Sequence, residues 1–70
     1  MTEIEQYQLA WHPKEGPGFR FKVRGGAWSG WVRVTASDLA AVAAIFNESP
    51  CYINSATGFL HTGAEPAGSD

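Results

Sequence analysis

The chain has 70 residues, a formal net charge of −2 at pH 7 and a single cysteine, Cys51. This length indicates one small domain, and a disulfide within the chain is excluded. The acidic balance argues against general binding of duplex DNA, which requires a basic surface. Because the N-terminus lacks a basic or apolar run and no stretch is long enough to span a membrane, we expect a cytoplasmic protein.

The last residues, 64–70, contain no large apolar side chain. We therefore expect one domain over 1–63 and a flexible C-terminal tail over 64–70. A domain of this size buries only about 60% of the surface that its unfolded chain exposes. Its core supplies about 3–5 kcal/mol, so stabilisation by a partner subunit is one hypothesis.

The first predicted strand covers Ile4–Trp11, where apolar and polar residues alternate loosely. Its alternation places Tyr7, Leu9 and Trp11 on one face. The following segment, 12–18, holds two prolines and two glycines. We expect it to be a loop, because these residues interrupt the hydrogen bonding of a strand.

A hairpin is predicted over Phe19–Thr35. Phe19–Arg24 alternates apolar with basic residues, and a similar rhythm resumes at Trp28. If Gly25 and Gly26 form a two-residue turn, both with positive φ, the register is fixed. The predicted pairs are Phe19 with Val32, Arg20 with Trp31, Phe21 with Gly30, Lys22 with Ser29 and Val23 with Trp28.

A helix is predicted over Ala36–Glu48, with Thr35 or Ser37 as its N-cap and Pro50 as the residue that stops it. One side carries an apolar stripe that should cover the sheet. The stripe consists of Leu39, Val42, Ala43, Ile45 and Phe46. The opposite side is small and almost uncharged, and its central residues are Ala40, Ala41 and Ala44.

A second hairpin is predicted from residues 51–54 and 59–62, with a four-residue loop between them. Its register pairs Ile53 with Leu60 and Tyr52 with His61. Inward-facing positions are then Cys51, Ile53 and Leu60, and outward-facing positions are Tyr52, Phe59 and His61.

These elements predict an α+β domain of two layers, with a mainly antiparallel sheet in the order β-β-β-α-β-β and one helix packed on one face. OB-fold barrels share this order of elements. The predicted strands are short for a closed barrel, so we favour an open sheet.

The wet face of the predicted sheet gathers four of the five basic residues of the chain together with aromatic rings. Basic residues among aromatics are typical of surfaces that bind single-stranded nucleic acid. An ordinary solvated sheet face is the simpler explanation and the one that we favour, with Arg20 and Trp31 as a cross-strand cation–π pair. The candidate binding face comprises Arg20, Lys22, Arg24, Trp31, Arg33, Tyr52, Phe59 and His61.

The sequence contains no convincing catalytic, cofactor or metal site. A zinc site needs at least three protein ligands, and His12, Cys51 and His61 lack any metal-binding spacing. A Cys51–His61 nucleophile pair is not expected, because the two side chains should lie on opposite faces of the second hairpin. We therefore predict a protein that is not an enzyme and needs no cofactor.

The first functional hypothesis is a small protein-interaction or regulatory domain that self-associates, a homodimer being one form, through the helix side formed by Ala40, Ala41 and Ala44. The alternative is a domain that binds single-stranded nucleic acid or another anionic ligand through the basic aromatic face. No membrane partner is expected.

Overall fold

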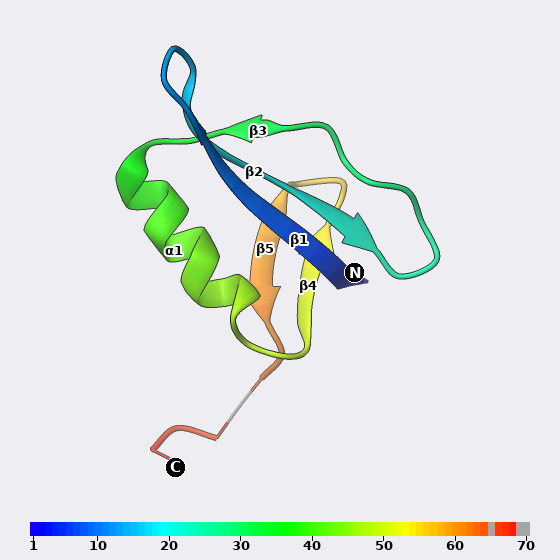
Figure 1. Cartoon of the computed structure of the whole chain (residues 1–70). Helices are drawn as coiled ribbons and strands as arrows, with labels where there is room; N and C mark the ends of the chain where they lie inside the picture. Colours follow the sequence, from blue (N-terminus) through cyan, green and yellow to red (C-terminus); the bar gives the residue numbers. More distant parts are fainter. Residues whose placement is uncertain (65, 69–70) are drawn as a thin grey trace.

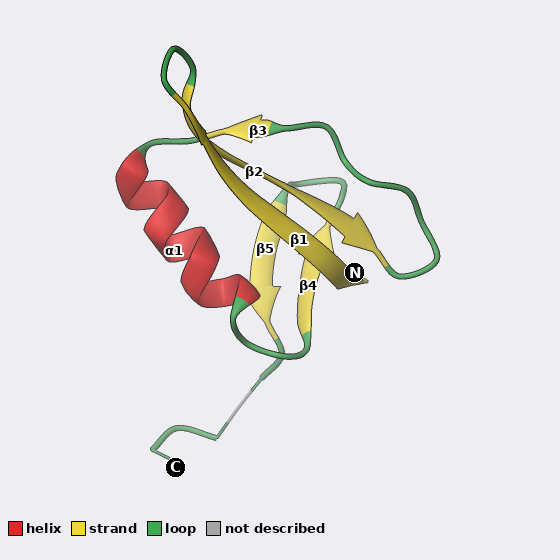
Figure 2. Ribbon diagram, in the orientation of Figure 1, coloured by secondary structure: helices red, strands yellow, loops and turns green. Residues whose placement is uncertain are grey.

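A computed structural model describes residues 1–64 and 66–68. The chain forms one curled, five-stranded antiparallel sheet with a single helix packed against it (Figure 1, Figure 2). This arrangement confirms the predicted α+β class. The elements are β1 (Thr2–His12), β2 (Gly16–Val23), β3 (Val32–Arg33), α1 (Ala36–Phe46), β4 (Cys51–Asn54) and β5 (Phe59–Thr62). Of the predicted tail, Glu65, Ser69 and Asp70 lie outside the described residues.

The strands lie in the order β3-β2-β1-β4-β5. After the helix, the chain returns to the far side of β1, so the first four strands form a Greek key. Among the described residues β3 and β5 do not pair with each other, so the sheet curls without closing. OB folds are partly open Greek-key barrels, and this chain shares with them the order of elements along the sequence and the Greek-key arrangement of the first four strands. Such a likeness does not by itself assign a function.

Strand β1 carries a bulge at Glu5. Ile4 pairs with Val23 and Gln6 pairs with Lys22, which leaves Glu5 without a residue opposite it. One extra residue reverses the alternation of side chains along a strand. Ile4 is therefore buried before the bulge, and Tyr7 reaches the helix after it, where its ring stacks on Phe46.

The predicted loop over 12–18 is wrong at both ends, because β1 continues to His12 and β2 already begins at Gly16. Pro17 lies opposite Trp11, and its carbonyl accepts a hydrogen bond of 3.3 Å from Val34 N–H on the β3 side. In an antiparallel strand the N–H and C=O of one residue point to the same side. The N–H that proline lacks would thus have pointed away from β1, so Pro17 costs the β1–β2 ladder nothing.

The turn after β2 differs from the predicted pair of glycines with positive φ. Only Gly25 has a positive φ, of 75°, and Gly26 N–H donates to the carbonyl of Val23 over 3.0 Å. The central turn residues are therefore Arg24 and Gly25, and a positive φ at the third of four turn positions is typical of a type II turn.

This turn shifts the register of the hairpin beside it. Phe19 pairs with Val32 as predicted, but Lys22 rather than Val23 lies opposite Trp28. Ser29, instead of Gly30, bonds to Phe21, because its N–H donates to the Phe21 carbonyl over 2.7 Å. A shift of one residue moves a side chain to the other face of the sheet. Trp28 consequently lies on the wet face, whereas the prediction placed it with Val23.

The helix begins as predicted, since Thr35 Oγ1 accepts a hydrogen bond of 3.0 Å from Asp38 N–H. It ends at Phe46 instead of the predicted Glu48. The chain tightens there, because Glu48 N–H donates to the carbonyl of Ile45, three residues back. The predicted apolar stripe does face the sheet, and Phe46 is its most buried member.

The core is small and centres on Phe46. Its ring stacks on Tyr7 at a centroid distance of 4.6 Å and meets the edge of Phe19 at 5.7 Å. The second hairpin has the predicted register, with Ile53 opposite Leu60. The buried hydrophobic residues of the described chain are Ile4, Phe19, Phe46, Cys51 and Ile53.

Replacing Phe46 by alanine should lower the free energy of unfolding by about 3–5 kcal/mol, because it leaves a cavity between the helix and the sheet. A loss of this size would unfold much of the protein at 25 °C. Urea denaturation followed by circular dichroism measures the change. The matched variant Phe59→Ala removes an exposed ring and should change the unfolding free energy little. Equal effects of the two variants would contradict this description of the core.

Candidate binding surface on the outer sheet face

The outer face is the side of the sheet that points away from helix α1. The predicted basic residues lie on this face. Arg20 and Lys22 alternate along β2 with the inward-facing side that holds Phe19, and Arg33 follows Val32, the residue that pairs with Phe19. Their polar contacts cross to β1 or to the turn that precedes β2. The contacts are Arg20 Nε to Gln8 Oε1 at 2.8 Å, Lys22 Nζ to Glu5 Oε1 at 2.7 Å, Arg24 Nε to Glu3 Oε1 at 3.0 Å, and Arg33 to Glu15.

Lys22, Arg24 and Arg33 therefore each face a carboxylate. Paired charges on an exposed sheet give a surface with little net potential. Among the basic residues of this face, Arg20 differs because its guanidinium contacts a neutral amide. The outer face is thus less positive than the sequence pattern predicted.

Two of these ion pairs also shift the pKa of one of their members. The hydrogen bond and the charge of Lys22 lower the pKa of Glu5 below its ordinary value. The hydrogen bond from Arg24 to Glu3, followed by the charge of Glu3, raises the pKa of the Arg24 guanidinium. Each shift favours the charged form of the group concerned, the Glu5 carboxylate and the Arg24 guanidinium.

Arg20 lies between two indole rings. Its guanidinium carbon is 4.7 Å from the ring centroid of Trp28 and 5.0 Å from that of Trp31. Trp31 was predicted as its neighbour. Trp28 was not, because the two-glycine turn assumed from the sequence placed it on the wrong face. We refer to Trp28, Arg20 and Trp31 as the Trp–Arg–Trp stack.

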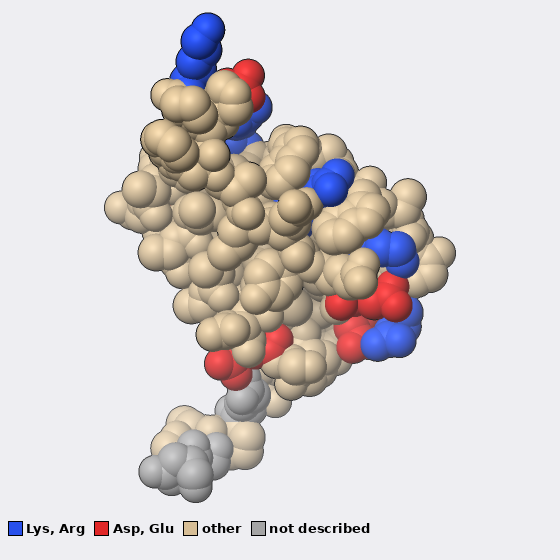
Figure 3. All heavy atoms as spheres, in the orientation of Figure 1, with Lys and Arg blue, Asp and Glu red and all other residues tan. Residues whose placement is uncertain are grey.

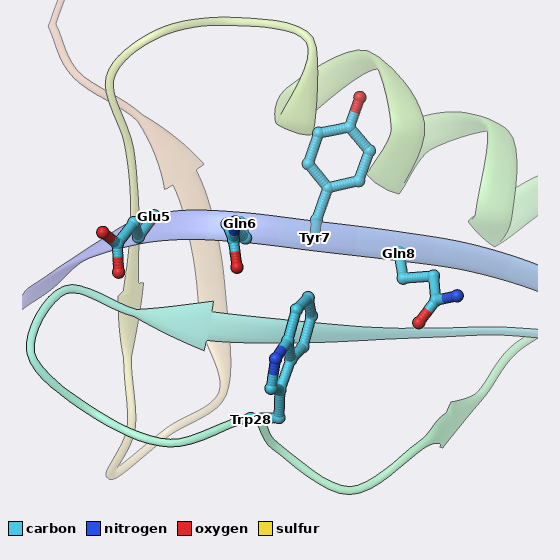
Figure 4. A pocket seen from close by; sticks show the side chains of 5 residues that line it. All are labelled: Glu5, Gln6, Tyr7, Gln8 and Trp28. Carbon is cyan, nitrogen blue, oxygen red and sulfur yellow. The ribbon is translucent and has the colours of Figure 1, made fainter.

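A shallow hollow of about 530 Å³ lies between Trp28 and strand β1 (Figure 4). Glu5, Gln6 and Gln8 project to the side of β1 on which Trp28 lies, whereas Tyr7 points the other way, towards the helix. The hollow thus combines an aromatic wall with amide and carboxylate groups.

A second groove, of about 240 Å³, lies beside Trp31, where the β1–β2 hairpin ends. Gly16 lines it and has open space where a side chain would stand, so ligand atoms can approach the backbone closely there. The ion-paired Arg33 and Glu15 also border it. The Trp–Arg–Trp stack therefore borders both hollows, one through Trp28 and the other through Trp31.

The remaining aromatic residues of the predicted binding face form a separate cluster on β4 and β5. The ring of His61 stacks with Tyr52 at 5.7 Å and with Phe59 at 5.1 Å, as centroid distances. Tyr52 pairs with Glu3, which in turn bonds to Arg24. The two ion pairs that join β1 to the β2 side, Glu3–Arg24 and Glu5–Lys22, thus lie between this cluster and the Trp–Arg–Trp stack.

The helix side that was predicted to self-associate is exposed at Ala40, Ala41 and Ala44. The molecular surface over α1 and the neighbouring part of β1 carries few charges, and Lys, Arg, Asp and Glu gather at its margins (Figure 3).

Within 1–64 and 66–68, no three or more His, Cys, Asp or Glu side chains are grouped to hold a metal ion. Cys51 is buried, and burial followed by the charge of Glu3 raises the pKa of its thiol. A raised thiol pKa lowers the fraction of reactive thiolate. None of the described helices is long and apolar enough to cross a membrane.

Replacing Lys22 by methionine should raise the pKa of Glu5 towards that of an exposed glutamate, because the hydrogen bond and the positive charge are lost. Since the native pKa is lowered, the pair contributes stability that is present above the unfolded pKa of Glu5 and is lost as the pH falls through its folded pKa. An NMR titration of the Glu5 carboxyl measures the shift. An unchanged pKa would show that the pair does not form in solution.

Comparison of the chain with protein-family models, curated proteins and solved structures finds no match.

Proposed function

We propose that this protein is a non-catalytic protein-interaction domain that recognises its partner with the Trp–Arg–Trp stack and the two adjoining hollows. The supporting observation is where the tryptophans lie. All three are exposed, at 69% for Trp11, 39% for Trp28 and 44% for Trp31. A small domain with a limited core leaves its largest apolar side chains in water.

Tryptophan and arginine are the residues most enriched among those that dominate the energy of protein interfaces. The stack brings both types together on one face. Arg20 is also held by Gln8, so the rings and the guanidinium are ordered before a partner arrives. Ordering in advance reduces the entropy lost on binding.

The two adjoining hollows favour a polypeptide as the partner. Each offers amide or charged groups next to an indole wall, which suits a chain with both apolar side chains and backbone hydrogen-bonding groups. The single-stranded nucleic acid alternative also uses Trp28 and Trp31 as stacking rings. It has less support, because carboxylates compensate Lys22, Arg24 and Arg33.

Selection of a displayed random-peptide library against the folded protein tests the proposal. We expect enriched peptides to lose about 10- to 100-fold in affinity when Trp31 or Trp28 is replaced by alanine, equivalent to about 1.4–2.8 kcal/mol. Fluorescence anisotropy of a labelled peptide measures the affinity. Phe59→Ala is the matched control, because it removes an exposed ring from the other aromatic cluster. Peptides that bind equally well to the Trp28 and Trp31 variants would refute the proposed surface.

Binding of oligothymidylate tests the alternative function, recognition of single-stranded nucleic acid. We expect no saturable binding at an ionic strength of about 0.15 M, because one uncompensated arginine neutralises few phosphates. Anisotropy titrations at low and physiological salt, with wild type and Arg20→Ala, provide the measurement. Binding that persists at physiological salt and depends on Arg20 and Trp31 would favour nucleic acid over a protein partner.

A further inference from the structure

Strand β1 has an open edge. On the side of β4 it pairs only through Thr2 and Glu3. Within the described part of the chain, no strand pairs with this edge beyond Glu3, whereas β2 accompanies β1 along its other edge as far as His12. Unpaired edges present rows of free N–H and C=O groups that can accept another strand.

The hydrogen bonds of β2 show which groups of β1 point to that edge. The carbonyls of Phe21 and Pro17 point to the β3 side, where they accept hydrogen bonds from Ser29 N–H and Val34 N–H respectively. The residues opposite Phe21, Phe19 and Pro17 therefore exchange no backbone hydrogen bonds with β2, because such pairs alternate in an antiparallel ladder. Those residues are Tyr7, Leu9 and Trp11, whose backbone groups consequently face the open edge.

This edge lacks the usual protection against pairing with another chain. Natural edge strands are commonly interrupted by lysine, proline or a bulge. The bulge and the charge of Glu5 stand at one end and Pro13 at the other, while residues 6–12 contain neither Lys, Arg, Asp, Glu nor Pro. Leu9, at 38%, and Trp11 are exposed on this stretch.

We propose that the open edge of β1 binds the same edge of a second copy of this chain, as an antiparallel pair about a two-fold axis at Leu9. This inference goes beyond the proposed function and does not depend on it. The dimer would join two sheets into one continuous sheet, with a Trp–Arg–Trp stack on each half.

The second copy is the occupant because the edge is self-complementary. Its limits, Gln6 and His12, are equally distant from Leu9, so this register uses the whole open segment and no more. Tyr7 then lies opposite Trp11 of the partner subunit, and Gln8 lies opposite Ala10 of the partner subunit. Each of the three residues whose backbone groups face the edge then lies opposite a residue whose backbone groups also face the edge. The two strands can therefore exchange hydrogen bonds symmetrically, as an isologous interface requires.

The surroundings also suit a second copy. The surface over α1 and the neighbouring part of β1 carries few charges (Figure 3), so two copies can approach there without bringing like charges together. Burial of Leu9 and Trp11 would extend the limited apolar core of each subunit.

Sedimentation equilibrium of the full chain tests this inference, at concentrations up to about 1 mM. We expect wild type to approach twice the monomer mass of 7.6 kDa. Leu9→Lys should weaken the dimer at least about tenfold, because it places two like charges at the axis. Leu9 lies outside the core, so this variant should stay folded by circular dichroism. Trp11→Lys is a second disrupting variant, at a position that is still more exposed.

The matched control is Phe59→Lys, which puts the same charge on an exposed apolar position of β5 and should leave the dimer intact. A strictly monomeric wild type would overturn the inference. A dimer that survives both Leu9→Lys and Trp11→Lys but dissociates in Ala40→Glu or Ala44→Glu would also overturn it, and would assign the contact to the helix. Leu9 lines neither hollow, whereas Trp11 borders the second groove, so Leu9→Lys is the variant that separates this inference from the peptide-binding proposal. None of these variants alters Trp28 or Trp31, and a monomeric wild type leaves the peptide-binding proposal standing.

Discussion

The bulge at Glu5 in β1 decides how the rest of the molecule is arranged. Before it, Ile4 enters the core and Glu3 reaches Arg24 on the outer face. After it, Tyr7 reaches Phe46, and Gln8 reaches Arg20 on the outer face. One strand can then pair with β4 at its start and with β2 along its length while keeping apolar side chains towards the helix. The fold, the outer face and the open edge all follow from this strand.

Strand β1 also neutralises much of the positive charge beside it. The carboxylates of Glu3 and Glu5 lie across from Arg24 and Lys22, so the stripe that stands out in the sequence is largely compensated in the folded chain. The distinctive feature of the outer face is therefore its exposed aromatic rings and not its charge. Arg20 holds two indoles at the surface, and ordered aromatic side chains next to polar hollows suit a polypeptide partner better than a polyanion.

Much of the fold could be predicted from local pattern. The Thr35 cap, the helix stripe and the second hairpin follow from capping chemistry and alternation, which depend on neighbouring residues. The bulge and the position of Trp28 could not be predicted in this way. The bulge depends on which strands flank β1, and Trp28 depends on a turn that uses one glycine with positive φ instead of two. The pairing of Pro17 also depends on its tertiary setting, because only the direction of its absent N–H makes it tolerable.

Strand β1 directs alternate backbone groups to β2 and to an open edge. Residue-resolved amide exchange by NMR, at a concentration where the protein is monomeric, distinguishes the two sets of groups. We expect slow exchange at Gln8 and Ala10, which face β2, and fast exchange at Tyr7, Leu9 and Trp11. At a concentration where the protein self-associates, the second group should become protected as well. Equal protection of both groups in the monomer would contradict this arrangement, because it would show that the edge is already paired within one chain.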